Sequence, residues 1–205
     1  MKAVQEENAS GTLRLFVAIA IPEPVRNAMA RVQRELQALA PPHAVRWTKP
    51  EQFHLTLRFL GDVAAARVEE LKAAVGAVCA NAPPLRLRAR EIGFFPNARS
   101  PRVIWLGIHD EERLLTGFQS RIEAAVGAFT GGRSEDPFTG HATLGRVKDL
   151  KRPDAGKLAA YAQQTGNAVL GEWTASEVEI IRSELSASGA RHAPLAGFRL
   201  ELLIR

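Results

Sequence analysis

One short motif occurs twice in this 205-residue chain, and its two copies constrain the fold more than any other feature. The tetrapeptide His-x-Thr-Leu stands at residues 54–57 and again at residues 141–144, 87 positions later. The first copy lies in FHLTLRFL, residues 53–60, where apolar and polar side chains alternate as in a strand with one buried face. The second lies in PFTGHATLGRV, residues 137–147, which we also interpret as a strand. Two such strands predict two halves that face each other across a pseudo-two-fold cleft.

Strand and helix patterns interleave along the rest of the chain, and no linker divides it. Apolar or alternating segments predict further strands at residues 13–21, 45–48, 85–92, 103–108, 177–182 and 198–204. Helical spacing predicts helices at residues 22–39, 64–80, 111–129 and 154–164. A loop containing Gly189 and Pro194 is expected to join the last two strands.

This order of elements predicts an α+β fold with two pseudo-symmetric lobes. Antiparallel-rich sheets are expected to flank a central cleft, with the helices on the outside. We expect residues 1–11 to form a flexible tail and residues 12–205 to form a single two-lobed domain.

The spacing within each motif has a chemical meaning. Residues i and i+2 of a strand project from the same face, about 6.5 to 7 Å apart. His54 therefore lies beside Thr56, and His141 beside Thr143. Because the pKa of histidine is normally near 6.5, one imidazole can act as a base and the other as an acid at neutral pH. Hydroxyl groups and an arginine fork can hold phosphate oxygens, so the pattern suits in-line displacement at phosphorus.

Two arginines follow the motifs and are candidates for binding phosphate. Strict alternation puts Arg58 on the same face as His54 and Thr56. The same alternation puts Arg146 on the face opposite His141, so it reaches a phosphate only if the strand bulges or ends near Gly145, which glycine permits. The chain holds 27 basic and 22 acidic residues. This excess indicates phosphate-bearing partners, although an arginine-rich proteome would produce it too.

Other residues indicate that the chain has no metal site and is not secreted. The one cysteine, Cys79, lies on an apolar helical pattern and has no partner for a disulfide. His43, His109 and His192 are not clustered as metal ligands usually are, and we expect them at the surface. The apolar run at residues 15–21 is too short to cross a bilayer and lacks a positive leader, so a cytoplasmic location is expected.

Around the motifs, the sequence resembles the two-histidine phosphoesterase superfamily, and within it the LigT-like RNA 2′,3′-cyclic phosphodiesterases, once called 2′-5′ RNA ligases. The likeness runs from about residue 13 to residue 205. It is carried by residues 15–18 (LFVA), 46–63 (RWTKPEQFHLTLRFLGDV), 93–96 (GFFP), 102–107 (RVIWLG) and 137–147 (PFTGHATLGRV).

The resemblance implies a function and roles for single residues. His54 would be the proton donor to the leaving oxygen and His141 the proton acceptor that activates water. Thr56, Thr143 and Arg146 would bind phosphate oxygens, with Arg58 as a further candidate. The implied reaction opens a terminal 2′,3′-cyclic phosphate of RNA to a 2′-phosphomonoester without a metal or cofactor. The implied partners are RNA or oligonucleotide ends rather than a membrane, and we expect a monomer.

Several alternatives stay open on the sequence alone. The same site could run in reverse as a 2′-5′ RNA ligase or act on another cyclic phosphate. A non-catalytic RNA-binding module and a structural protein with a chance repeat are the other classes. Phe94, Phe95 and Trp105 could stack on a base or belong to the core.

Overall fold

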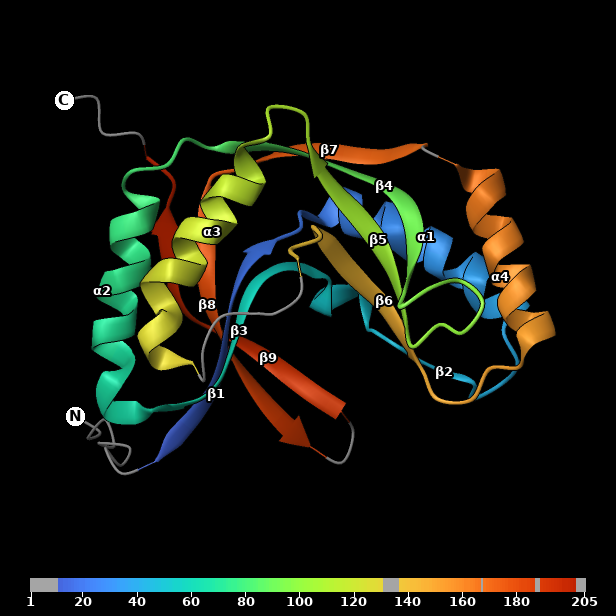
Figure 1. Cartoon of the computed structure of the whole chain (residues 1–205), viewed down its shortest axis with the longest axis horizontal. Helices are drawn as coiled ribbons and strands as arrows, with labels where there is room; N and C mark the ends of the chain where they lie inside the picture. Colours follow the sequence, from blue (N-terminus) through green and yellow to red (C-terminus); the bar gives the residue numbers. More distant parts are fainter. Residues whose placement is uncertain (1–10, 131–136, 167, 187–188, 202–205) are drawn as a thin grey trace, which may run out of the picture.

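The computed structural model describes residues 11–130, 137–166, 168–186 and 189–201 (Figure 1). Of the tail expected at residues 1–11, only Gly11 lies among the described residues. No described helix has both the length and the hydrophobicity required to span a bilayer.

The described strands form two sheets, and their antiparallel character agrees with the predicted antiparallel-rich sheets. The first sheet has the order β3-β1-β8-β9 and the second the order β2-β6-β5-β4-β7. All their pairings are antiparallel. The first sheet comprises β1 (Thr12–Ala20), β3 (His54–Ala64), β8 (Glu177–Ser186) and β9 (Gly189–Arg199). The second comprises β2 (Val45–Trp47), β4 (Leu85–Phe95), β5 (Val103–Asp110), β6 (His141–Val147) and β7 (Val169–Ala175).

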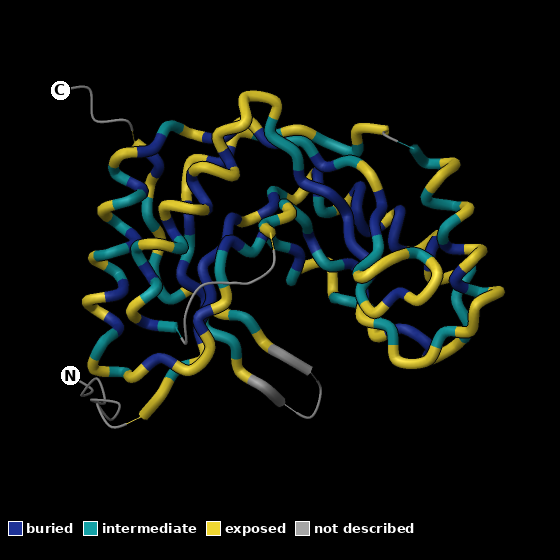
Figure 2. Tube along the Cα trace, in the orientation of Figure 1, coloured by how far each residue is buried: buried dark blue, intermediate teal, exposed yellow. Residues whose placement is uncertain are grey.

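The described residues form four α-helices, which pack on the outside of this pair of sheets. They are α1 (Glu23–Leu39), α2 (Val68–Cys79), α3 (Leu114–Val126) and α4 (Arg152–Thr165). In Figure 1, α2 and α3 stand beside the first sheet, and α1 and α4 stand beside the second. Figure 2 shows turns of these helices alternating between buried and exposed, as expected for helices with one face on a core. One continuous hydrophobic cluster includes residues of both sheets and all four helices.

The helix-facing side of each sheet can be identified from the residues of that cluster. On β1, Leu15, Val17 and Ile19 belong to it, whereas Phe16 and Ala18 form a small separate cluster with Ile181 of β8. Phe16 and Ala18 therefore mark the inner face of the first sheet, opposite the helices. On β5 of the second sheet, the core residues are Ile104, Leu106 and Ile108. The side chains of Val103 and Trp105 point to the other, inner face because successive residues of a strand alternate.

Two parts of the predicted strand order were wrong. β7 was not predicted, because Gly171 and Glu172 interrupt its apolar pattern. Gly171 lies where α1 approaches closely, since a Cβ there would come within 2.8 Å of Val25 Cγ2. The segment with Gly189 and Pro194 was expected to be a loop, yet it is β9, an edge strand with a register shift between Ile180 and Ile181 of its partner β8. Edge strands tolerate proline because they need fewer ladder hydrogen bonds.

The two motif strands share an irregularity that the alternation pattern does not reveal. β3 has an extra residue at Leu57, since Val17 pairs with Arg58 but Ala18 pairs with Thr56. β6 has an extra residue at Leu144, since Ile104 pairs with Gly145 but Trp105 pairs with Thr143. Each motif thus ends in a β-bulge, which moves the side chains directly after it to the other face.

Gly145 directly follows the bulge in β6 and is closely packed, and this gives a first test. A Cβ at Gly145 would lie 2.7 Å from Val45 Cγ1 and 2.9 Å from Trp47 Cε3. We expect Gly145→Ala to lower the free energy of unfolding by about 1–3 kcal/mol, measured by urea denaturation.

Gly117 of α3 supplies the matched control, because a Cβ there would meet nothing within 4 Å. Gly117→Ala should raise the free energy of unfolding by about 0.5–1 kcal/mol, since alanine favours helix interiors over glycine. Equal stability of Gly145→Ala and the wild type would contradict the close packing over this bulge.

Candidate active site

The two motif histidines occupy equivalent places in the two sheets. His54 is the first residue of β3 and His141 is the first residue of β6. His54 pairs with Ala20 of β1, and His141 pairs with Gly107 of β5, so both imidazoles lie on the inner faces. The two rings interact electrostatically, because a positive charge on His141 lowers the pKa of His54.

A backbone carbonyl orients each imidazole in the same way. His54 Nδ1 lies 2.7 Å from the carbonyl oxygen of Gln52, and His141 Nδ1 lies 2.7 Å from that of Thr139. Because a carbonyl can only accept, Nδ1 carries the proton in both rings. The neutral form of each histidine therefore presents an unprotonated Nε2, the atom that can accept a proton from a reactant.

Burial lowers the pKa of both imidazoles. For His54 the value falls from 6.5 to about 4, mainly by desolvation, with smaller contributions from charges on His192 and His141. For His141 desolvation again dominates, and Arg146 adds to the lowering. The hydrogen bond to the backbone carbonyl opposes the shift in both cases. Both rings are therefore mostly neutral at pH 7 in the free protein.

Aromatic rings flank each histidine. The His54 ring centroid lies 4.8 Å from that of Phe16 and 5.3 Å from that of His192. The His141 ring meets Phe95 edge-on at 5.1 Å and Trp105 at 6.0 Å. These contacts hold the rings in place and explain why burial, rather than a charged partner, dominates the pKa shifts.

The motif threonines lie on the same inner faces. Thr56 pairs with Ala18 of β1, and Thr143 pairs with Trp105 of β5. Within the described part of the chain, neither hydroxyl is engaged in a hydrogen bond, and both side chains are half-buried. Both hydroxyls are available as donors beside the histidines.

Arg146 shares the face of His141 because of the bulge at Leu144. Val103, Trp105 and Gly107 of β5 pair with Arg146, Thr143 and His141, and these alternate residues of β5 share one face. The strand does bulge beside Gly145, which is the condition that the sequence set for Arg146 to reach a phosphate. The Arg146 side chain is exposed, and its charge acts on His141.

The alternation that put Arg58 beside His54 and Thr56 is wrong. The extra residue at Leu57 pairs Arg58 with Val17, a core residue on the helix side of the sheet. The guanidinium of Arg58 lies there with α3, where Nη1 is 3.4 Å from Glu123 Oε1. The position on the inner face is taken instead by Phe59, which pairs with Phe16 and is 61% exposed.

The three remaining histidines were expected at the surface, and only His43 is exposed. His192 belongs to β9 and contacts both His54 and Phe16, with ring centroids 5.3 and 5.0 Å away. Its Nδ1 is buried without a hydrogen-bond partner. Sequence reasoning missed this residue because the segment was interpreted as a loop. His109 is half-buried on β5, with Nε2 3.3 Å from Glu91 Oε2.

The aromatic residues considered for stacking divide between the two faces of the second sheet. Phe94 pairs with Ile104 and packs against the core. Phe95 pairs with Val103 and lies on the inner face, with its ring centroid 5.0 Å from that of Trp105. Trp105 is 9% exposed, and its Nε1 is buried without a hydrogen-bond partner.

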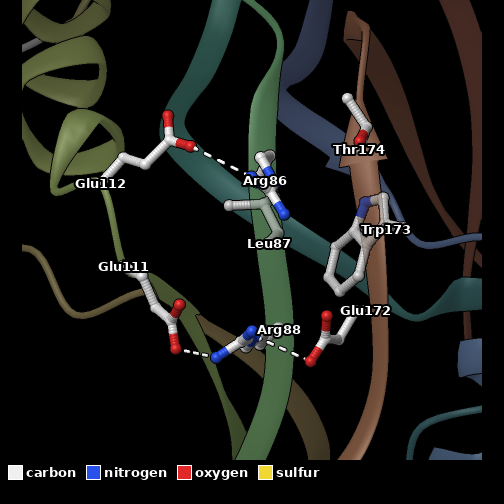
Figure 3. Close-up of a pocket in the computed structure, with 8 residues that line it drawn as sticks. All are labelled: Arg86, Leu87, Arg88, Glu111, Glu112, Glu172, Trp173 and Thr174. Atoms are coloured by element: carbon white, nitrogen blue, oxygen red, sulfur yellow. Dashed lines mark ion pairs between the residues drawn. The ribbon is translucent and has the colours of Figure 1, made fainter.

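Two surface clefts have neither His54 nor His141 in their lining. One, of about 300 Å³, is lined by β4, β7 and the segment after β5 (Figure 3). There Arg88 lies between Glu111 and Glu172, forming ion pairs with both, and Arg86 Nη1 is 3.8 Å from Glu112 Oε1. The other, of about 330 Å³, lies between α3 and the start of β4. The first cleft has two arginines and three glutamates in its lining, so it offers no net attraction for an anion.

The described residues contain no group of three or more His, Cys, Asp or Glu side chains placed to hold a metal ion. Cys79 is buried, and desolvation raises the pKa of its thiol to about 12. A thiol in that state is a poor nucleophile at neutral pH.

The chain is similar in sequence to one protein family and to several enzymes of known name. The family model described as LigT like Phosphoesterase matches residues 19–105. An RNA 2′,3′-cyclic phosphodiesterase of Methanothermobacter thermautotrophicus is 31% identical over 188 residues, covering 92% of this chain and 99% of the relative. The enzyme of the same name from Thermus thermophilus is also 31% identical, covering 92% of this chain and 90% of the relative.

Solved structures show the same fold. A crystal structure of a Thermus thermophilus protein matches with a TM-score of 0.74 at 27% identity, covering 92% of this chain and 98% of that one. E. coli LigT complexed with 3′-AMP matches with a TM-score of 0.70 at 26% identity, again covering 92% and 98%.

The lowered pKa of His54 makes stability depend on pH. The unfolded chain binds a proton at this residue near pH 6.5 and the folded chain only near pH 4, so acid between these values favours unfolding. We expect the free energy of unfolding to fall by about 3 kcal/mol from this group as the pH drops from 7 to below 4. Urea denaturation at a series of pH values measures the loss.

In the variant His54→Gln this part of the pH dependence should disappear, while the smaller loss from His141 stays. His43→Gln is the control for replacing a histidine outside the site, because His43 is exposed. A wild-type profile that is flat from pH 7 to pH 4 would show that His54 is not desolvated.

Proposed function

The chain belongs to the LigT-like phosphoesterase family, and from this premise we propose that it hydrolyses the 2′,3′-cyclic phosphate at RNA ends to a 2′-phosphomonoester. The observation that carries the proposal is the matched pair of imidazoles. Two histidines begin equivalent strands, each with Nδ1 bound to a carbonyl and Nε2 available. Curated relatives over nearly the full chain are named RNA 2′,3′-cyclic phosphodiesterase.

The two imidazoles would act at opposite sides of the phosphorus. His141 Nε2 takes a proton from water, and the water oxygen forms a bond to phosphorus. The bond from phosphorus to the 3′ oxygen breaks, and His54 Nε2 delivers a proton to that oxygen. The products are a 2′-phosphomonoester and a free 3′-hydroxyl, and solvent returns both histidines to their starting states.

The acid must gain its proton despite its burial. Because desolvation keeps His54 neutral near pH 7, a bound anion has to supply the compensating charge. The cyclic phosphate is such an anion, so substrate binding raises the pKa of His54 and promotes the protonated form that the reaction needs. Binding and activation of the acid are thereby coupled.

The remaining contacts to the phosphate would come from three side chains. Thr56 and Thr143 offer hydroxyl donors from the two strands, one beside each histidine. Arg146 offers its guanidinium fork from the end of β6. Arg58 is left out of this set, because the guanidinium lies on the helix side with Glu123. The nucleotide itself would lie against Phe95 and Trp105, whose rings flank His141.

The decisive assay uses an RNA oligonucleotide ending in a 2′,3′-cyclic phosphate, with EDTA present. Wild type, His54→Ala and His141→Ala are compared, and the product is identified as the 2′- or 3′-phosphate. We expect turnover to the 2′-phosphate, reduced by about 10²–10⁴-fold in each variant, because each removes one member of the acid-base pair.

His43→Ala serves as the control for replacing a histidine outside the site, and it should turn over like wild type. Full activity in either motif variant would remove that histidine from the mechanism. A folded wild type that binds the RNA but never hydrolyses it would favour the non-catalytic module instead.

The rate should also depend on pH in a way set by the two buried imidazoles. The productive form has one ring protonated and the other neutral, and kcat/KM reports the free enzyme. Since burial lowers both pKa values below 6.5, we expect a bell-shaped kcat/KM profile with its maximum below pH 6.5. Steady-state rates on 2′,3′-cyclic CMP from pH 4 to pH 9 measure it.

The maximum of the kcat profile should lie at higher pH than the maximum of the kcat/KM profile, because the bound anion raises the pKa of His54. A kcat/KM that rises continuously from pH 6.5 to pH 9 is incompatible with an imidazole acid in this site.

A further inference from the structure

We propose that Arg46 of β2 binds the phosphodiester of the nucleotide that precedes the cyclic end, next to Arg146. This inference rests on the proposed function and extends it from the reacting phosphate to the RNA chain behind it. It assigns a role to a residue of the edge strand that lies outside both motifs.

The strand register places the two arginines side by side. Arg46 pairs directly with Arg146 in the antiparallel ladder of β2 and β6. Paired residues of an antiparallel ladder point to the same face, with Cβ atoms about 4.5–5.5 Å apart. Arg146 shares its face with Thr143 and His141, so Arg46 does as well. The neighbours of Arg46 confirm this orientation, since Val45 is in the core and Trp47 packs against it.

The charges of this pair are not neutralised within the described part of the chain. Both side chains are exposed, and neither takes part in an ion pair or hydrogen bond there. Arg86 and Arg88 of the same sheet differ, since they are paired with Glu112, Glu111 and Glu172. Like charges directly opposite each other destabilise a sheet, so an anion between them would be favoured. Two guanidinium forks suit a phosphate group.

The position of β2 favours a phosphate of the polynucleotide over a second contact to the reacting group. β2 is the edge strand of its sheet, and β6 lies between it and the rest. Arg46 is therefore one strand spacing, about 4.8 Å, further from the centre of the sheet than Arg146. The RNA chain beyond the terminal nucleotide has to leave the histidine pair over an edge, and its next charge is the preceding phosphodiester.

The test compares two substrates that differ by one nucleotide, an adenosine and the phosphodiester that joins it to the cyclic end. The first is 2′,3′-cyclic CMP, and the second is the dinucleotide ApC with a 2′,3′-cyclic phosphate. We expect the wild type to prefer the dinucleotide, and Arg46→Gln to lower the ratio of the two kcat/KM values five- to twentyfold. Arg34→Gln is the matched control, because Arg34 is exposed on α1 and its removal changes the net charge equally. It should keep the wild-type ratio.

Binding supplies a readout that does not need turnover. Fluorescence anisotropy of a 5′-labelled trinucleotide 2′-phosphate is recorded over a series of salt concentrations. Arg46→Gln should reduce the slope of log K against log [salt] by close to one phosphate contact, about 0.7 for a single strand. Arg46→Lys should restore most of the slope, because it restores the charge.

The outcomes separate this inference from the proposed function. An unchanged substrate ratio together with an unchanged salt slope overturns the role of Arg46. An equal loss on both substrates overturns it too, because Arg46 would then act on the reacting end. If the wild type hydrolyses neither substrate, the proposed function fails, and the salt slope of Arg46→Gln still decides whether Arg46 binds RNA phosphate.

Discussion

The hydrogen bond from each histidine Nδ1 to a carbonyl two residues earlier is the contact on which the chemistry of the site depends. It forms where the chain enters β3 and β6, so the backbone that begins the strand also orients the ring that begins it. This bond fixes the tautomer and turns Nε2 away from the backbone. Because Gln52 and Thr139 contribute only their carbonyls, their side chains are not needed for it. The motif can therefore start with different residues and still produce two equivalent imidazoles.

Both halves of the site contain the same kind of β-bulge, but different side chains follow it on the inner face. Both strands gain one residue directly after the threonine, at Leu57 and at Leu144. The fifth residue after each histidine consequently returns to the inner face. In the first half that residue is Phe59, an exposed aromatic side chain, and in the second it is Arg146. The symmetry of the backbone thus presents an apolar side chain in one half of the site and a cationic one in the other.

Much of this arrangement could be predicted from the sequence, because a period-two pattern identifies strands and buried faces directly. That pattern predicts the α+β class and the motif strands. It also predicts that Thr56 lies beside His54 and Thr143 beside His141. The bulge at Leu144 was foreseeable from Gly145, whereas the bulge at Leu57 is followed by Arg58 and carries no such signal. Arg58 was therefore placed on the wrong face. His192 was missed because its contact with His54 joins the two outer strands of a curled sheet, and no local pattern encodes such a contact.

The electrostatics of the site favour a negatively charged ligand over a positively charged one. Desolvation keeps His54, His141 and His192 neutral, so the centre of the site holds little charge of its own near pH 7. An exposed cation at the end of β6, Arg146, acts on His141. An anion that enters gains from this guanidinium and from the threonine hydroxyls, and it raises the pKa of the buried rings. A cation gains nothing and is repelled. In the proposed mechanism, the protonation state needed for catalysis is thus produced by the substrate, and the free protein avoids the cost of burying charged imidazoles.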